Sequence, residues 1–400
     1  MAGYRRLRDR VHRRAFLSGM VAGGRGMGMG LVLAACTTSP PTHVPATQKV
    51  GAPTLKVGGS FREAVTTDPD TFDPHVTSDP ASSAVFANIY STLLFQDFDK
   101  TYKPLIVDRM DVGQDNKTLT FTLRQNVKFT NGDPLDATAV KFTFDRLKQI
   151  GTKSPLFETA NNFAAIDVVD PRTVRITLNS PQATIFHDLA TEYAGILSPK
   201  AVNQAGERYA RQPVGSGPYS LEDWKTGQEV TLVRNAGFAW PEPYYENSGA
   251  PYIERHRFRV IPEPATTQQL FDIGELDVLI LSTANVGKYD QNPKVKTYKL
   301  PVSGISYVGF NCRKAPFDDR TVRQALSHAI DKDEIVRVAL GGELGQVINT
   351  PLPPSVWGYD ENLGQYNYRY DPEAAKLLLA QLGYRPGPDG VVGRQNLGRA

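Results

Sequence analysis

The sequence has few of the residues that mark catalytic, metal or disulfide chemistry. Only two cysteines and six histidines occur among 400 residues, without an HExxH pair or a Cys/His cluster. The stretch VGSGPYS lacks the Gly-x-Ser-x-Gly spacing of a nucleophile elbow. We therefore expect no catalytic residue, no metal site and no cofactor, and the chain is predicted not to be an enzyme.

The most apolar run near the N-terminus is too short and too rich in glycine for a membrane-spanning helix, which needs roughly 20 predominantly apolar residues. Residues 19–35 contain Arg25 and six glycines, and their layout is typical of a secretory signal. Within residues 1–35, HRRAFL resembles a twin-arginine export signal. LAAC, which ends at Cys36, resembles the lipobox of bacterial lipoproteins. We expect cleavage before Cys36 and a lipid on its thiol; the alternative is an ordinary signal with an incidental cysteine.

Loss of the signal reverses the sign of the net charge. The formal charge is +3 for all 400 residues, and −3 once residues 1–35 are removed, since 38 basic and 41 acidic residues remain. Neither nucleic acid nor an anionic lipid surface is thus implied as a partner. With Cys36 lipidated, Cys312 has no partner for an intrachain disulfide. The proline-rich residues 36–54 are predicted to be the lipidated cysteine and a flexible tether.

The remaining chain alternates between strand and helix patterns, which indicates an α/β fold. Strands are predicted where apolar residues alternate, as in residues 118–129, 170–180, 229–235 and 252–261. In the last of these, three arginines are predicted to form a solvated face. Helices are predicted after Asp136, after Asp318 or Asp319, and after Asp331. The helix after Asp318 or Asp319 is expected to have a buried stripe formed by Val322, Ala325, Leu326, Ala329 and Ile330. Gly215 and Gly217 are expected to allow close approach of the backbone.

Six segments in order resemble family 5 of the solute-binding proteins of ABC importers. They include REAVTTDPDTFDPHVTSDPASS, TLTFTLRQNVKFTNGDPLDATAV, PVGSGPYSLEDW and GFNCRKAPFDDRTVRQALSHAID. The resemblance extends from about Leu55 to about Tyr384. It implies a two-lobed periplasmic-binding-protein-like fold of the large class, with an inserted extra domain. Lobe one would comprise residues 55–90 and 197–299, the inserted domain residues 91–196, and an incomplete lobe two residues 300–400.

The resemblance also implies which stretches face the ligand cleft. They are residues 76–82, 152–157, 281–284 and 303–307, which are loops or strand ends. The ligand-binding residues expected in them are Ser78, Asp79, Pro80, Thr152, Leu156, Leu281, Ser282, Thr283, Ser303 and Tyr307. Neutral donors beside apolar side chains favour a peptide, which strand edges can bind through its backbone.

The function implied is capture of peptides outside the cytoplasmic membrane by a monomeric, lipid-anchored receptor that delivers them to the permease subunits of an ABC importer. Three alternatives stay open: a receptor for another solute, such as an oligosaccharide or a nickel chelate; a non-transporting fragment; and a lipoprotein hydrolase. Because members of the family continue well beyond the last residues seen here, we expect the chain to be truncated at its C-terminus.

Overall fold

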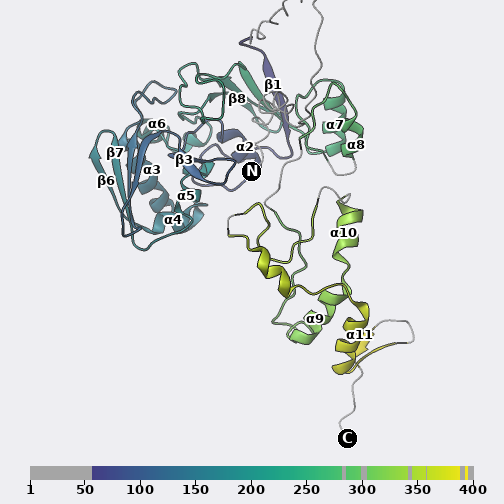
Figure 1. Ribbon diagram of the computed structural model, residues 1–400. Coiled ribbons are helices and arrows are strands. Elements are labelled where there is room, and N and C mark those ends of the chain that lie inside the picture. Colours follow the sequence, from purple (N-terminus) through teal and green to yellow (C-terminus); the bar gives the residue numbers. More distant parts are fainter. Residues whose placement is uncertain are drawn as a thin grey trace, which may run out of the picture. The chain divides into compact units, whose positions relative to one another are not determined.

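The computed structural model describes residues 56–281, 285–298, 304–340, 345–356, 358–387 and 392–394 (Figure 1). The predicted signal, Cys36 and the tether lie outside the described residues, as do Ser282, Thr283 and Ser303. The described chain divides into two compact units, residues 56–279 and the residues from Ile280 onward. Among the described helices, none combines the length and the apolar character that crossing a bilayer requires.

One four-stranded sheet of the first unit joins segments that are far apart in the sequence. Its order is β1 (Ser60–Val65), β10 (Arg255–Val260), β9 (Glu229–Arg234) and β8 (Tyr219–Lys225), and β1 pairs with β10 in parallel while the other pairs are antiparallel. The predicted alternation in β10 is confirmed, because His256 and Phe258 are buried whereas Arg255 is exposed. Arg255 forms an ion pair with Glu222 at 2.8 Å across the sheet.

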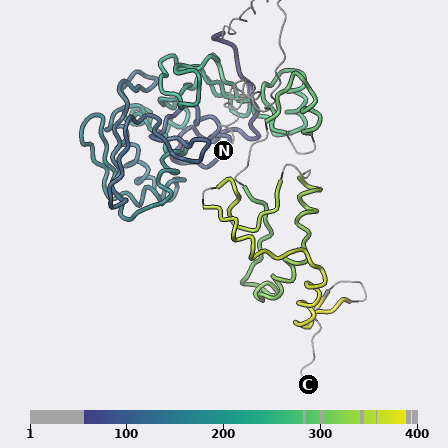
Figure 2. Tube along the Cα trace, in the orientation of Figure 1, coloured from purple at the N-terminus to yellow at the C-terminus, as the bar shows by residue number. Residues whose placement is uncertain are grey.

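A hydrophobic core packs against this sheet and is built from both ends of the unit. Phe72, Phe86 and Ile89 come from the N-terminal part, and Tyr209 and Leu232 from the part after residue 197. The helical elements here are α2 (Pro80–Phe86), α6 (Pro199–Ala205) and the 3-10 turn η4 (Gly206–Ala210). Figure 2 shows the chain leaving this region, building a second one and returning.

The second region is a four-stranded antiparallel sheet with the order β4 (Val107–Val112), β5 (Thr118–Leu123), β7 (Thr173–Leu178) and β6 (Phe163–Asp170). The long helix α3 (Ala137–Ile150) packs against β6 and β7 (Figure 1). Asp136 caps α3 as predicted, since its Oδ1 accepts hydrogen bonds from the amides of Thr138 and Ala139 at 2.9 and 3.0 Å. The strand predicted in residues 118–129 is confirmed over its first half, as β5, which ends at Leu123, and the strand predicted in residues 170–180 is confirmed as β7. Their apolar residues, with Val140 and Phe144 of α3, form the second core.

The other elements of the first unit are short. They are β2 (Leu94–Gln96), β3 (Tyr102–Pro104), α4 (Phe157–Asn161), α5 (Ile185–Asp188), α7 (Pro264–Asp272), and the 3-10 turns η2 (Gly151–Lys153) and η3 (Glu192–Ala194). The strands β2 and β3 pair with each other, and the side chain of Arg62 on β1 binds Asp277 after α7 at 3.0 Å.

The second unit contains the helices α8 (Val286–Asp290), α9 (Arg320–Ala329), α10 (Lys332–Ala339) and α11 (Pro372–Gln381), the 3-10 helix η6 (Glu361–Tyr366), and the strand pair β11 (Tyr384–Pro386) and β12 (Val392–Arg394). Asp319 and Asp331 cap α9 and α10, as predicted, and α11 packs against α9.

The buried stripe predicted for α9 is only partly correct. Val322 and Ala325 are buried, but Ala329 is exposed, and Leu326 and Ile330 are half-buried. The helix ends at Ala329, and Ile330 has extended backbone angles. The helical spacing therefore stops before the predicted stripe does.

Candidate functional site

The loop from Asp70 to Ser82 carries three of the predicted ligand-binding residues. Ser78 and Pro80 are exposed, and Asp79 is half-buried. Asp79 caps α2, because its Oδ2 accepts a 2.7 Å hydrogen bond from the amide of Ser82. Pro80 occupies the first turn of that helix, where its missing N–H is not needed.

Side-chain hydrogen bonds brace this loop from within. The carboxylate of Asp70 accepts from the Thr77 hydroxyl at 2.9 Å and from the Ser82 hydroxyl at 2.7 Å. The Thr77 hydroxyl oxygen in turn accepts from the amide of Asp79 at 3.0 Å. The exposed residues thus stand on a turn whose backbone is fixed on both sides, as a binding loop on a rigid scaffold requires.

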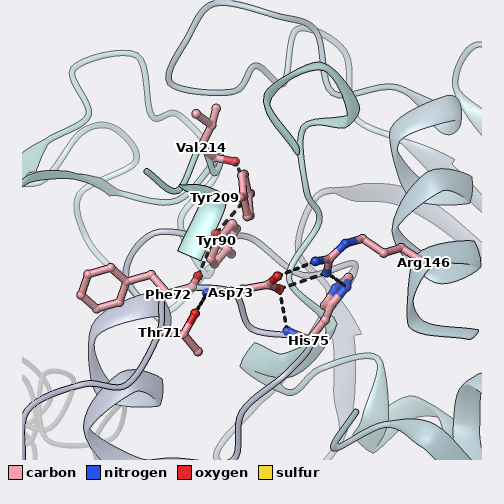
Figure 3. A network of polar contacts seen from close by, with 8 residues as sticks. All are labelled: Thr71, Phe72, Asp73, His75, Tyr90, Arg146, Tyr209 and Val214. Carbon is pink, nitrogen blue, oxygen red and sulfur yellow. Dashed lines mark hydrogen bonds and ion pairs between the residues drawn. The ribbon is translucent and has the colours of Figure 1, made fainter. Parts of the chain in front are cut away.

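A buried ionic cluster lies at the base of the loop (Figure 3). Asp73 and His75 of the loop meet Arg146, which projects from α3. The side chains of Asp73 and Arg146 are only 8% and 19% exposed, and His75 is fully buried. The two terminal nitrogens of Arg146 bind the two carboxylate oxygens of Asp73, and its Nη1 also lies 2.9 Å from Nδ1 of His75. The cluster therefore ties the loop of one core to the helix of the other.

The imidazole of His75 is neutral in this cluster. Burial lowers the pKa of His75 to about 3; the Asp73 carboxylate opposes that shift, and the charge of Arg146 adds to it. Because a guanidinium can only donate, Nδ1 of His75 accepts the hydrogen bond and the ring proton is on Nε2. His75 thus serves as a neutral acceptor beside the ion pair.

Tyr90 holds the backbone just before Asp73 and contacts a second buried tyrosine, Tyr209. The Tyr90 hydroxyl donates to the carbonyl of Phe72 at 3.0 Å and lies 3.2 Å from the Tyr209 hydroxyl, which donates to the carbonyl of Val214 at 3.1 Å (Figure 3). Burial raises the pKa of both tyrosines. Both hydroxyls therefore remain protonated donors.

Close backbone approach fixes the segment that follows α2. A Cβ atom at Gly215 would lie 2.1 Å from the carbonyl oxygen of Ile89, and one at Gly217 would lie 2.5 Å from that of Asn88. The amide of Gly217 donates to the carbonyl of Ile89 at 2.7 Å. The predicted close approach at both glycines is confirmed.

The other predicted ligand-binding residues differ in their surroundings. Thr152 is exposed in η2, whereas Leu156 is only 8% exposed and belongs to the second hydrophobic core. Leu281 is half-buried, and Tyr307 is 80% exposed. Because Leu281 and Tyr307 belong to the second unit, their convergence with the loop of Ser78 stays a prediction.

Two hollows among the described residues lie away from the predicted ligand-binding residues. One has a volume of about 300 Å³ and is lined by Phe310, Cys312, Arg320, Arg323, Gln324, Ser327 and Tyr368. The other has about 230 Å³ and is lined by Phe129, Asp133, Pro134, Asp136, Thr138, Ala139, Ser198, Pro199 and Lys200. Neither contains a predicted ligand-binding residue. Within the described ranges, no group of three or more His, Cys, Asp or Glu side chains is arranged to hold a metal ion.

The cluster of Asp73, His75 and Arg146 was not among the predicted site residues. Asp73 and His75 lie in the sequence FDPH, directly before the predicted ligand-binding residues. Arg146 occurs in the helix predicted after Asp136, and its position between Phe144 and Leu147 does not indicate a partner 73 positions earlier. One sequence signal was present: an arginine beside buried helix positions requires an acceptor.

Comparison with known proteins identifies one family. The model of the bacterial extracellular solute-binding proteins, family 5 (middle), matches residues 101–397. Among curated proteins, the glutathione-binding protein GsiB of Salmonella paratyphi A is 31% identical over 321 residues, or 80% of this chain and 60% of that protein. The "probable D,D-dipeptide-binding periplasmic protein DdpA" of Escherichia coli (strain K12) is 32% identical over 312 residues, which cover 75% of this chain and 58% of that protein. The chain spans about 60% of the length of these curated relatives.

Solved structures show the same fold. The periplasmic binding protein DppA of Helicobacter pylori, in complex with the peptide STSA, is 26% identical with a TM-score of 0.66, covering 83% of this chain and 68% of that one. NikA of Brucella suis, in complex with Fe(III)-EDTA, is 26% identical with a TM-score of 0.72, covering 84% of this chain and 67% of that one. The predicted α/β periplasmic-binding-protein fold is thus confirmed. So is the expectation of a non-enzymatic protein, because the matching family consists of binding proteins.

Proposed function

Because the chain belongs to the bacterial extracellular solute-binding proteins of family 5, we propose that it captures a solute outside the cytoplasmic membrane and delivers it to the permease of an ABC importer. The match of the family model over residues 101–397 carries this proposal. The braced loop at Ser78 and Asp79 supports it, since a receptor needs exposed polar groups on a rigid base.

Short peptides are the proposed ligands. The two curated relatives described above are named for glutathione, which is a tripeptide, and for D,D-dipeptides. The structure of DppA contains a peptide, whereas that of NikA contains a metal chelate. The predicted cleft residues contain neutral hydroxyl groups at Ser78 and Thr152 and no histidine. Such groups suit the amides and carbonyls of an extended peptide better than they suit a metal.

The proposed domain organisation follows the predicted boundaries. Lobe one would comprise residues 55–90 and 197–299, residues 91–196 would form the inserted domain, and lobe two would start near residue 300. The two hydrophobic cores of the first unit support the first division, since one draws on residues 65–90 and 197–258 and the other mainly on residues 93–196. Ser78, Asp79, Thr152, Leu156, Leu281 and Tyr307, with Ser282, Thr283 and Ser303, would contribute to the cleft between the lobes.

A lipid anchor at Cys36 is proposed to hold the receptor at the membrane. The sequence LAAC and the proline-rich residues after it support this, as does the extracellular site of action of the family. A diacylglyceryl group together with an amide-linked chain would satisfy the requirement of about two lipid signals for stable anchoring. The HRRAFL motif supports export by the twin-arginine route.

Titration calorimetry tests the proposed ligand class. The purified chain would be titrated with reduced glutathione, the dipeptide Met-Leu and the tetrapeptide Ser-Thr-Ser-Ala, and, as matched controls, with a nickel–histidine chelate and a maltooligosaccharide. We expect saturable binding of at least one peptide and none of the controls. Tight binding of the chelate or the sugar without peptide binding would contradict the proposal.

A further inference from the structure

We propose that Arg146 is a positioning residue for ligand binding, because its bonds to Asp73 and His75 hold the loop that presents Ser78 and Asp79. This inference rests on the proposed function, which places residues 76–80 at the ligand. Arg146 itself would not touch the ligand. It would act by fixing the base of a loop that belongs to a different hydrophobic core.

The bonds of Arg146 cross from one core to the other. The buried face of α3, including Val140, Phe144 and Leu147, belongs to the core of the second sheet. Phe72, directly before Asp73, belongs to the core of the first sheet. The guanidinium on α3 therefore links the two cores, together with other contacts such as the 3.1 Å hydrogen bond from the amide of Leu197 to the Thr143 hydroxyl of α3.

The shape of the guanidinium suits this task. Its planar fork binds both carboxylate oxygens of Asp73 and keeps a further N–H for Nδ1 of His75. A lysine ammonium could not make these bonds in the same plane. The low exposure of both partners limits screening by solvent, and removal of either charge leaves the other buried without its counter-charge.

Hydrogen bonds hold the loop both within the cluster and directly after it. Oδ1 of Asp73 accepts from the amide of His75 at 3.1 Å, and Asp73 in turn is held through its amide by the Thr71 hydroxyl at 3.1 Å. Two residues beyond His75, Thr77 binds Asp70 and Asp79. A loop held in this way loses little conformational entropy when it binds a ligand.

Three variants separate positioning from general stability. Arg146→Met removes the bonds and leaves Asp73 unpaired. The double variant with Asp73→Asn and Arg146→Met removes both charges and leaves no unpaired buried charge. It therefore replaces the single variant if the unpaired Asp73 prevents folding. Arg146→Lys keeps the charge but loses the fork. Leu147→Ala is the matched control, because it creates a cavity on the adjacent position of α3 and destabilises the same core without contact to the loop.

Hydrogen exchange of the full chain without ligand is the first readout. The amides of Val76, Asp79 and Ser82 are expected to exchange at least tenfold faster in Arg146→Met and in the double variant than in the wild type. The Arg146→Lys variant should be intermediate. In Leu147→Ala these amides should change no more than those of the first sheet. Equal exchange in the Arg146 and Leu147 variants would overturn the proposal.

Calorimetry with reduced glutathione, Met-Leu and Ser-Thr-Ser-Ala is the second readout. For any of these that the wild type binds, we expect at least tenfold weaker binding in the double variant and a change within twofold in Leu147→Ala. Unchanged affinity in the double variant would overturn the positioning role. If the wild type binds none of the three, the proposed peptide function fails, and the exchange rates alone decide whether Arg146 orders the loop.

Discussion

Acidification from pH 8 to pH 5 is expected to weaken the first unit through His75. The unfolded imidazole has a pKa near 6.5 and takes up a proton in this range. In the folded chain burial lowers the pKa of His75 to about 3, so the folded state stays unprotonated. Because the unfolded state binds more protons, the free energy of unfolding falls as the pH falls.

The size of the effect follows from the two pKa values. A pH of 5 is about 1.5 units below the pKa of the unfolded imidazole, which is therefore protonated. It is about 2 units above the pKa of His75 in the folded chain, which is therefore neutral. At about 1.4 kcal/mol per unit, the loss attributable to His75 is about 2 kcal/mol. It is absent well above pH 6.5 and continues to grow until the pH approaches 3.

Urea unfolding of the wild type and of His75→Asn at pH 8 and pH 5 isolates this contribution. Asparagine keeps an acceptor oxygen near the position of Nδ1 for Arg146, but it does not titrate. Carboxylates elsewhere contribute equally to both proteins, and Trp224 and Trp240 report on the first unit. The wild type should lose about 2 kcal/mol more than the variant between the two pH values. Equal losses would show that His75 is not held neutral in the folded chain.

Three further predictions concern the anchor, the close approach and the helix cap. Cys36→Ser should move the protein from the membrane fraction to the soluble fraction and lower its mass by the lipid; an unchanged distribution and mass would contradict lipidation. Gly217→Ala should destabilise the first unit by about 1–3 kcal/mol in urea unfolding, because the added methyl group would meet the Asn88 carbonyl. In the control variant Gly237→Ala the nearest atom is 3.5 Å from the methyl group. Equal stability of the two variants would show that the backbone can relax. Asp136→Ala should cost about 1 kcal/mol by removing the cap of α3, and a thermal midpoint equal to that of wild type would disprove this role.

Local patterns predicted much of the fold because they depend on residues that are neighbours along the chain. The alternation of Leu119, Phe121 and Leu123 determines which face of β5 is buried, and Asp136 caps the helix that starts at the next residue. The arginines of β10 likewise occupy one face of a strand. Such features need no knowledge of the tertiary structure.

Contacts between distant segments could not be predicted in the same way. No residue pattern near Asp73 indicates Arg146 as its partner, because the pairing requires α3 to pack beside the loop. The resemblance predicts Leu156 at the cleft, whereas its packing in the second core depends on distant segments that no local pattern around it indicates. The six family segments predicted the architecture where local physics could not, because they reflect the packing of a whole fold.

Mass spectrometry of the molecules that the purified chain releases on denaturation tests the proposed ligand class most directly. The protein would be exported and isolated under native conditions, and a mock purification from cells without it would serve as the control. We expect short peptides of mixed sequence, released in proportion to the protein. Release of a sugar, a metal chelate or heme in their place would contradict the central claim that this chain captures peptides.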